Sequence, residues 1–427
     1  MAKKTINKEL TGAQDLYNFL FEACNIIRGP VSQDNFKDYI TPLLYYKRIS
    51  DVYDEETEEA LISSGGDKEY ASLPEQHRFV IPDGCHWQEV RERTENLGAA
   101  IVGAMRQIEI ANPDTLYGVL SMFSSQKWTN KAILNDSKIR DLIEHLSKRK
   151  LGNKDYPADL MGDAYEILLK KFADDSKAQA GEFYTPRSVV RLLVHILDPQ
   201  PGETVYDPAC GSGGMLIEAI RYMHDDSLCC GSIFGQEKNV VNAAIAKMNL
   251  FLHGASDFNV MQGDTLRDPK ILQGGNIAKF DCVIANPPFS LENWGATEWS
   301  SDKYKRNIYG TPSDSCGDYA WIQHMICSMS SGKGRMAVVM PQGILFRGNQ
   351  EAEIRKQLVE SDLIEAVVTL GDKLFYGTGL SPCFLIIRRM KQAHHSGRIL
   401  MIDGSKILTQ KRAQNILEEN DIDRLSS

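Results

Sequence analysis

The chain has 427 residues, 42% of them hydrophobic and 25% charged, a composition typical of a globular protein with more than one domain. No stretch approaches the ~20 consecutive apolar residues of a membrane span, and the polar start Met1-Ala2-Lys3-Lys4 does not resemble a secretory signal, so we expect a cytoplasmic protein. The formal net charge of -9 argues against a chain that holds nucleic acid by itself, because such proteins usually present a basic surface to the phosphates.

Residues 1–150 are predicted to form a helical domain. Thr11-Gly12-Ala13-Gln14 has the spacing of a capping box, and apolar residues then recur at helical intervals until Gly29-Pro30. Further helical patterns cover residues 36–50 and 87–110, and a loop-like stretch with two prolines, residues 73–85, separates them. The region holds no catalytic constellation, so we interpret it as a scaffold or docking domain.

The nine cysteines and nine histidines show no metal-binding pattern. No C-x-x-C pair and no H-E-x-x-H occurs, and Cys229 and Cys230 are adjacent, which is poor spacing for a zinc site or a disulfide framework. We interpret the cysteines as reduced and mostly buried, and we expect no metal ion.

Residues 151–405 are predicted to form an α/β domain. A helical pattern covers residues 158–173, a connecting stretch follows through residues 177–187, and a second helix runs to Leu197. From there short apolar runs alternate with helices. The apolar runs are residues 204–206, 232–235, 259–261, 281–285, 335–340 and 363–369, with helical patterns over 215–223 and 240–252. This alternation predicts a doubly wound, Rossmann-like parallel sheet covered by helices on both faces, with ligands bound at the carboxyl ends of the strands.

A glycine-rich turn follows the first apolar run, with the sequence Asp207-Pro208-Ala209-Cys210-Gly211-Ser212-Gly213-Gly214. Glycines let a backbone approach a ligand closely, and the following helix offers unpaired N–H groups. The turn lacks the Gly-Lys-Ser/Thr of a P-loop and the usual G-x-G-x-x-G of dinucleotide sites. Its residues, including Asp207 and Gly211, are candidate cofactor contacts, although a plain glycine turn would look similar.

Two acidic residues follow the next two apolar runs. Glu237 stands where the second strand of a doubly wound sheet commonly binds ribose hydroxyls, and Asp264 follows the third run, where it could accept from the exocyclic amine of an adenine. A single ligand with an amino-acid part, a ribose and an adenine explains the turn and both acids. S-adenosylmethionine fits this description.

The fourth apolar run ends in Asn286-Pro287-Pro288-Phe289. The Asn side-chain oxygen and the carbonyl of the following Pro could accept hydrogen bonds from the two N–H bonds of an amino group, and the aromatic ring could stack on the base that carries it. These four residues are our candidate catalytic residues, for methyl transfer to an amine. Asn-Pro and Pro-Pro are also ordinary turn signals.

Together, these motifs resemble those of the methyltransferase subunit of type I restriction-modification systems, in the gamma group of amino-methyltransferases. The resemblance rests on Gly181-Glu182-Phe183-Tyr184-Thr185-Pro186-Arg187, on the glycine-rich turn and on Asn286-Pro287-Pro288-Phe289, in that order. The stretch from Asp38 to Asp51 is similar to the family's N-terminal domain, and Gly317-Asp318-Tyr319-Ala320-Trp321 matches another recurrent segment.

The resemblance implies methyl transfer from S-adenosylmethionine to adenine N6 in double-stranded DNA. It also implies that residues Glu182, Phe183, Tyr184, Thr185, Pro186 and Arg187 close over the methionine end of the cofactor. Ser212, Gly213 and Gly214 would contact the cofactor and Glu237 its ribose. In this family a separate specificity subunit reads the DNA and holds two copies of the methyltransferase, and a restriction and translocation subunit can join, which would account for the acidic net charge.

The predicted mechanism begins with an adenine flipped out of the duplex and stacked on Phe289, followed by in-line transfer and loss of the N6 proton to water. Residues 290–315 are either a flap beside the base or an ordinary surface loop. Cytosine N4 and a glutamine side-chain amide remain alternative substrates, and a subunit that only supports a partner's activity is the alternative from another class. The tail, residues 406–427, is polar and helix-prone, and we expect it to begin the helices that in this family pack against the specificity subunit.

Overall fold

The computed structural model describes residues 2–116, 118–120, 125–175, 185–223, 231–255, 257–375, 382–411 and 415–426. The chain divides into two compact units. Unit 1 comprises residues 1–178 with 247–254, and unit 2 comprises residues 179–246 with 255–427. No helix among the described residues is both long and apolar enough to cross a membrane.

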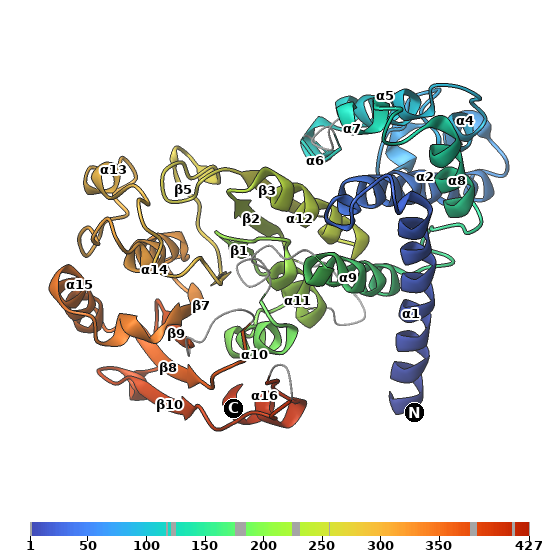
Figure 1. Cartoon of the computed structure of the whole chain (residues 1–427). Helices are drawn as coiled ribbons and strands as arrows, with labels where there is room; N and C mark the ends of the chain where they lie inside the picture. The colour runs from blue at the N-terminus through green and yellow to red at the C-terminus, as the bar shows by residue number, and fades with distance from the viewer. Residues whose placement is uncertain are drawn as a thin grey trace. The chain divides into compact units, whose positions relative to one another are not determined.

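Unit 1 is helical (Figure 1). Its helices are α1 (Ala2–Ile27), α2 (Lys37–Ser63), α3 (Lys68–Ala71), α4 (Trp87–Arg91), α5 (Leu97–Ala111), α6 (Pro113–Leu116), α7 (Ser125–Thr129), α8 (Asp136–Leu146) and α9 (Ala158–Asp175). Helix α1 packs against α8 and α9. The buried Arg48 of α2 donates to the carbonyl oxygens of Leu151 and Tyr156, the latter at 3.0 Å, and so holds the segment before α9 against α2.

Two details of unit 1 differ from the sequence predictions. Helix α1 begins at Ala2, so the capping box predicted at Thr11 is wrong, and Thr11 lies inside the helix. The helix predicted over residues 87–110 is two helices, α4 and α5, separated at Asn96, which has a φ of +54°. The carboxylate of Asp136 accepts the N–H groups of Asn96 and Leu97, each at 3.1 Å, and fixes the break from 40 residues away.

Unit 2 contains an eight-stranded sheet with the strand order β10-β8-β9-β7-β6-β1-β2-β3. The strands are β1 (Val205–Asp207), β2 (Ile233–Glu237), β3 (Phe258–Gln262), β6 (Cys282–Ala285), β7 (Arg335–Pro341), β8 (Ile364–Leu370), β9 (Pro382–Arg388) and β10 (Leu400–Gly404). All pairs are parallel except those of β9, which runs antiparallel between β7 and β8. The order reverses beside β1, because β2 and β3 lie on one side of it and β6 and β7 on the other.

Helices cover both faces of the sheet, as predicted. The helices after residue 178 are α10 (Arg187–Leu197), α11 (Gly214–Met223), α12 (Val240–Leu252), α13 (Ala296–Ser300), α14 (Asp318–Ser328), α15 (Asn349–Glu360) and α16 (Glu419–Ser426), and the end of α12, from Lys247, belongs to unit 1. Helix α10 contacts β6 and β7, and α14 contacts β7 and lies on the other side of the strands in Figure 1. Every residue of β7 is buried, and its Val338 and Met340 share a core with Trp321 and Met325 of α14.

Two strands and a hairpin lie outside the predicted pattern. Strands β9 and β10 were not predicted, and β9 breaks the parallel pattern because an apolar run does not encode strand direction. The short strands β4 (Leu272–Gln273) and β5 (Asn276–Ile277) form a hairpin through Gly274-Gly275, both with positive φ, as such two-residue turns require. Six of the seven described cysteines are buried, which confirms the interpretation of those six, and Cys229 and Cys230 lie outside the described residues.

Candidate active site at the carboxyl edge of the sheet

The predicted site residues after β1, β2, β3 and β6 lie along one edge of the sheet, because these four strands are parallel neighbours. This edge includes the point beside β1 where the strand order reverses. Doubly wound sheets commonly bind their ligands in the crevice at such a point.

The glycine-rich turn leaves β1 at Asp207 and enters α11 at Gly214. Gly211 and Gly213 have φ angles of +54° and +85°, a backbone conformation that disfavours other residues, and Ser212 lies between them. Asp207 is buried and accepts the N–H of Ala209 at 2.9 Å. Burial raises the pKa of Asp207 to about 8, and the neighbouring Glu237 adds to the effect.

Glu237, the last residue of β2, holds the turn directly. Its Oε2 accepts the N–H of Gly211 at 3.0 Å, and its Oε1 accepts the N–H of Asn239 at 2.7 Å. A carboxylate has about four acceptor positions, so Glu237 retains room for a further donor such as a hydroxyl. Burial raises the pKa of Glu237 as well. Glu237 and Gly211, which the sequence analysis assigned to one cofactor, are therefore in direct contact.

Asp264, which follows β3, is tied to the same place through Lys238. Its Oδ2 pairs with Lys238 Nζ at 2.8 Å, and Lys238 is the residue after Glu237. Its Oδ1 accepts the N–H groups of Leu266 and Arg267 at 3.2 and 3.3 Å. The Lys238 side chain is largely exposed, and such ion pairs contribute only about 0–1 kcal/mol, so the carboxylate can exchange this partner for another.

Asn286 carries the least satisfied polar atom of the site. Its Nδ2 donates to Thr185 Oγ1 at 2.9 Å, which orients the amide. Its Oδ1 is buried and accepts no hydrogen bond from the part of the chain that the structure describes. Buried polar atoms are nearly always paired, so an exception calls for an explanation, and a catalytic role is one such explanation. Of the next residues, Pro287 is buried, Pro288 exposed and Phe289 half-buried.

The segment predicted to close over the cofactor is described in part. Glu182, Phe183 and Tyr184 lie outside the described residues. Thr185 is half-buried, Pro186 is buried, and Arg187 begins α10. The bond from Asn286 to Thr185 brings the end of this segment to the predicted catalytic residues, 101 positions away in sequence.

Two residues without a predicted site role hold the chain immediately after Phe289. Asp318, only 1% exposed, accepts the N–H of Ser290 at 2.7 Å and pairs with Arg347. Arg347 Nη1 also lies 3.4 Å from Ser290 Oγ, and its Nε donates to Glu351 at 2.6 Å. Asp318 stands in a segment that the resemblance singled out, but its pairing with Arg347, 29 positions later, leaves no local signal in the sequence.

Residues 290–317 pack against the domain through two tryptophans. Trp294 and Trp299 are buried and in edge contact, with ring centroids 5.6 Å apart. The buried guanidinium of Arg306 lies over the Trp299 ring and donates to the carbonyl oxygens of Thr265 and Leu266 at 2.8 and 2.7 Å. The segment is therefore anchored to the loop that carries Asp264.

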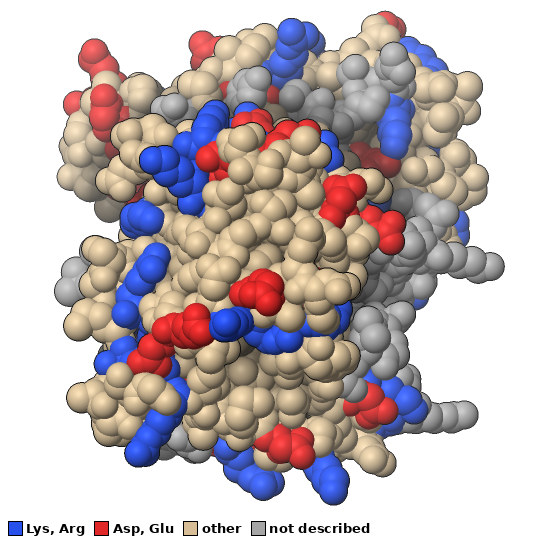
Figure 2. Space-filling model, turned by 90° about the vertical axis from the view of Figure 1, so that its left-hand side faces the viewer, with Lys and Arg blue, Asp and Glu red and all other residues tan. Residues whose placement is uncertain are grey.

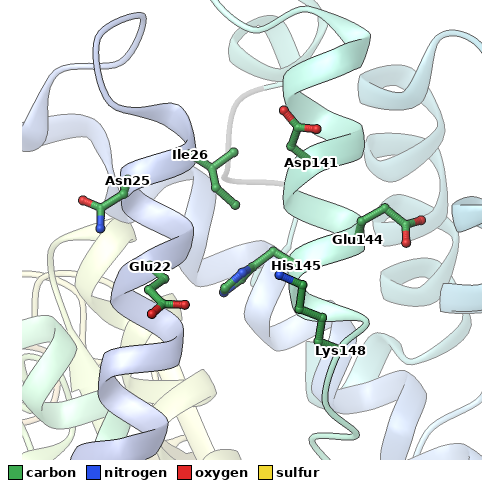
Figure 3. Close-up of a pocket in the computed structure, with 7 residues that line it drawn as sticks. All are labelled: Glu22, Asn25, Ile26, Asp141, Glu144, His145 and Lys148. Carbon is green, nitrogen blue, oxygen red and sulfur yellow. The ribbon is translucent and has the colours of Figure 1, made fainter.

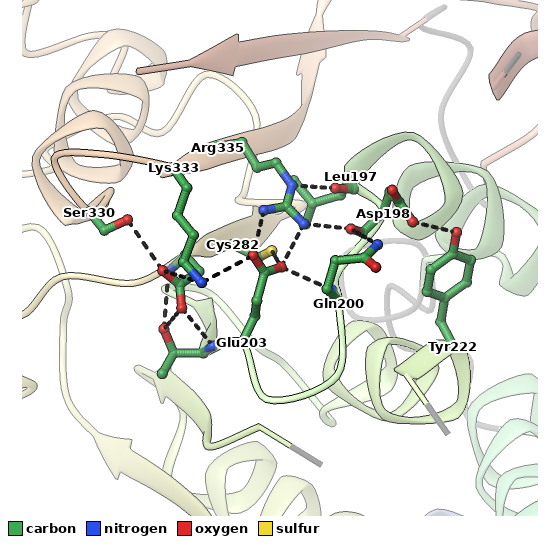
Figure 4. Close-up of polar contacts among 11 residues, drawn as sticks. Leu197, Asp198, Gln200, Glu203, Tyr222, Cys282, Ser330, Lys333 and Arg335 are labelled. Carbon is green, nitrogen blue, oxygen red and sulfur yellow. Dashed lines mark hydrogen bonds and ion pairs between the residues drawn. The ribbon is translucent and has the colours of Figure 1, made fainter. Parts of the chain in front are cut away.

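The opposite, amino edge of the same sheet holds a paired ionic network (Figure 4). Arg335, the first residue of β7, donates to both carboxylate oxygens of Glu203 at 3.1 and 2.7 Å, and to the carbonyl oxygens of Leu197 and Asp198. Burial alone would raise the pKa of Glu203, but the hydrogen bonds from Arg335 and from the Gln200 N–H lower it to about 2.

Unit 1 contains a groove of about 510 Å³, shown in Figure 3. It lies between α1 and α8 and is lined by Glu22, Asn25, Ile26, Asp141, Glu144, His145 and Lys148. None of these residues was predicted as a site residue. No group of three or more potential metal ligands occurs among the described residues.

The face shown in Figure 2 carries Lys and Arg interspersed with Asp and Glu, between larger areas of other residues. No single-sign field covers this face. Like the net charge of -9 of the whole chain, this face gives no sign of a broad basic surface for nucleic acid.

Comparisons with known proteins match both the N-terminal and the C-terminal part of the chain. Residues 156–427 match the family model for N-6 DNA methylases, and residues 16–146 match the model for the HsdM N-terminal domain. Over 404 residues the chain is 34% identical to the type I restriction enzyme MjaVII methylase subunit of Methanocaldococcus jannaschii. This match covers 90% of the chain and 67% of the relative. It is 27% identical over 394 residues to the EcoKI methylase subunit of Escherichia coli, covering 88% of this chain and 67% of that one.

The fold is also similar to a solved structure. The crystal structure of the type I restriction-modification system methyltransferase subunit from Streptococcus thermophilus superposes with a TM-score of 0.80 at 26% identity. The match covers 97% of this chain and 92% of that one, so it includes both units.

Proposed function

This chain belongs to the N-6 DNA methylase family, as a methylase subunit of the type I restriction-modification class, and from that premise we propose how its carboxyl edge transfers a methyl group. It is an adenine-specific DNA methyltransferase. We place S-adenosylmethionine along the turn after β1 and the target adenine at Asn286-Pro287-Pro288-Phe289. The observation that carries this proposal is the buried Oδ1 of Asn286, which accepts no hydrogen bond from the described residues.

Asn286 supplies the acceptor that a poorly nucleophilic amine requires. The lone pair of adenine N6 is delocalised into the ring, and acceptors placed along both N–H bonds favour the geometry in which it can attack. The Thr185 contact uses the amide nitrogen of Asn286, so its oxygen is left for the target amine. The carbonyl of the ring-constrained Pro287 is the second acceptor, and the half-buried Phe289 offers its ring to the base. Catalysis of this kind comes from preorganised positions.

The cofactor residues fit S-adenosylmethionine by their donor and acceptor chemistry. The bound cofactor supplies an electrophilic methyl group on a sulfonium. Glu237 retains acceptor positions for ribose hydroxyls, and Asp264 can accept from an adenine amine in place of Lys238. Asp207, Gly211, Ser212, Gly213 and Gly214 shape the turn beside the methionine part, and Thr185, Pro186 and Arg187 bring the preceding segment to it. Glu182, Phe183 and Tyr184 would complete that segment.

The DNA target is delivered by partner subunits. Methylase subunits of type I restriction-modification systems work with specificity and restriction subunits and act on DNA. We propose that one specificity subunit holds two copies of this chain, and that residues 406–427 contribute to that contact. The acidic net charge and the mixed charge of the face in Figure 2 support a partner that supplies most of the phosphate contacts. We propose a cytoplasmic location.

The proposal is tested by labelled methyl transfer from S-adenosylmethionine to double-stranded DNA, with and without a specificity subunit, followed by nucleoside analysis. We expect N6-methyladenine as the product and a large increase in rate when the specificity subunit is present. Label in N4-methylcytosine or in a protein glutamine would contradict the adenine assignment. Equal rates with and without the partner would contradict the delivery of DNA by that subunit.

A further inference from the structure

Phe346 is the most exposed aromatic side chain among the described residues. Its side chain is 74% exposed, although Ile344, two positions earlier, is only 2% exposed. Scattered exposed apolar residues are normal on protein surfaces and need no explanation by themselves. The support and the position of Phe346 distinguish it from the others.

The turn that carries Phe346 is held on both sides. It follows β7 and the short helix η3 (Gln342–Leu345), and the N–H groups of Phe346 and Arg347 both donate to the Gly343 carbonyl, at 3.2 and 2.9 Å. Tyr319 Oη donates to the Ile344 carbonyl at 2.7 Å. Arg355 Nη1 donates to the carbonyl of Ile344 at 3.1 Å and to that of Arg347 at 2.8 Å. The phenyl ring is therefore presented to solvent on a fixed support.

This turn is tied to the predicted target-base site. Strands β6 and β7 are parallel neighbours, so Asn286 and the Phe346 turn follow the same edge of the sheet. Arg347, next to Phe346, reaches the hydroxyl of Ser290, and Ser290 follows Phe289. Asp318 accepts the N–H of Ser290 and pairs with Arg347, which joins the two segments a second time.

A duplex from which one base has been extruded has a gap in its stack, and unstacking a base costs free energy that a nearby side chain can offset. Proteins that kink or open DNA frequently insert apolar side chains between base steps for this reason. We propose that Phe346 enters the duplex beside the target adenine and occupies the place that the flipped base leaves. This role rests on the proposed function, because it requires an adenine bound at Asn286.

The test compares two DNA substrates in a complex reconstituted with a specificity subunit. In one the target adenine is paired, and in the other it faces an abasic site, so that less free energy is needed to extrude it. We expect Phe346→Ala to lower kcat/KM on the paired duplex on the order of 10- to 100-fold, and on the abasic duplex by less than about 3-fold. Phe346→Trp should restore the rate on the paired duplex.

Met390→Ala is the matched control. Met390 is 71% exposed and follows β9, whose antiparallel direction places its end at the opposite edge of the sheet. Its removal should leave both rates unchanged. An equal loss of rate on both duplexes with Phe346→Ala would overturn the proposal, and so would failure of that variant to bind the specificity subunit in gel filtration, which would make Phe346 a protein contact. If the wild-type complex forms no N6-methyladenine, the proposed function fails and this role fails with it.

Discussion

At the amino edge of the sheet, Arg335 and Glu203 satisfy one another with two hydrogen bonds, and backbone carbonyl oxygens accept the other guanidinium donors. At the carboxyl edge, Asn286 has a buried oxygen that no described group donates to, and the buried carboxyl of Asp207 accepts the N–H of Ala209 instead of pairing with a cation of the described residues. Both edges belong to the same strands and the same hydrophobic core. The polar groups at the two edges nevertheless have different kinds of partner.

The pKa values of the carboxyl groups at the two edges are shifted in opposite directions. At the amino edge the partners of Glu203 outweigh its burial and lower its pKa to about 2. At the carboxyl edge burial dominates and raises the pKa of both Asp207 and Glu237. Carboxyl groups whose pKa is raised by burial, at a sheet edge where ligands commonly bind, are candidates for a functional site, and structural ion-pair networks such as that of Glu203 shift pKa values as well. The comparison shows that Glu203 is paired with a cation whereas Asp207 and Glu237 accept backbone N–H groups, so the partners of these carboxyl groups, more than their burial, distinguish the two edges.

Removing Arg335 should cause the largest loss of stability. Arg335→Met leaves Glu203 buried without its partner, and breaking a buried ion pair in this way typically lowers the free energy of unfolding by about 3–5 kcal/mol. Chemical denaturation measures this loss. We expect methyl transfer by the folded variant to be retained in the reconstituted complex, because Arg335 lies at the edge away from the predicted site.

Lys333→Met is the matched control for that change. Lys333 lies 3.5 Å from the same Glu203, but 63% of its side chain is exposed, so its removal should cost no more than about 1 kcal/mol. If both variants unfold at the same denaturant concentration, the amino edge is not the stabilising network that the contacts indicate.

At the carboxyl edge, Asn286→Ala should reduce function without a comparable loss of stability. Loss of one preorganised hydrogen-bonding group commonly lowers kcat by about 10²- to 10³-fold, equivalent to about 3–4 kcal/mol. The free energy of unfolding should change by only about 1 kcal/mol, because the variant loses the one hydrogen bond to Thr185, and the Asn286 oxygen has no partner to lose among the described residues. Rapid-quench methyl transfer and chemical denaturation measure the two quantities.

Glu237→Ala provides the contrast at the same edge. Glu237 contacts the cofactor turn, so calorimetric titration should show weaker binding of S-adenosylmethionine to this variant and unchanged binding to Asn286→Ala. Near-normal methyl transfer by Asn286→Ala would remove Asn286 from the mechanism, and equal cofactor affinity of all three proteins would remove Glu237 from the cofactor site.

The fold could be predicted from the sequence where the signal is local. Short apolar runs alternating with amphipathic helices indicate a parallel sheet, and the ends of parallel strands share an edge, so Asp207, Glu237 and Asn286 could be placed together before any coordinates. The position and direction of β9 could not, because a buried apolar run is compatible with either direction. The break between α4 and α5 is fixed by Asp136, which the local helical pattern does not include.

The candidate site shows the same limit. Motifs indicated candidate residues for contacts with ligands, but not the groups that hold those residues. Thr185 orients Asn286 across 101 positions, and Asp318 holds Ser290 across 28. Such contacts depend on how strands and helices are brought together, and a single sequence carries no periodicity that reports them. The exposure of Phe346 is likewise a property of the folded turn, because the sequence presents it as one more apolar residue.

The last prediction concerns the pH dependence of stability, which has opposite signs at the two edges. Glu203 binds a proton near pH 4.5 in the unfolded chain but only near about 2 in the folded one, so its contribution to stability is lost as pH falls through this range. Asp207 keeps its proton up to about pH 8 in the folded protein and releases it near 3.8 when unfolded, so stability falls as pH rises between these values. A single ionisable group contributes at most about 1.4 kcal/mol per pH unit to the slope of the free energy of unfolding against pH.

Denaturation midpoints measured from pH 3 to pH 8 separate the two contributions. Glu203→Gln should remove the loss of stability on the acid side, at the expense of a less stable protein at neutral pH, because the amide cannot pair with Arg335. Asp207→Asn should flatten the decline between pH 5 and pH 8, because the amide has no proton to release into a buried site. If the profile of Asp207→Asn matches that of the wild type in this range, Asp207 ionises at the same pH in both states, and the carboxyl edge is more polar than its burial indicates.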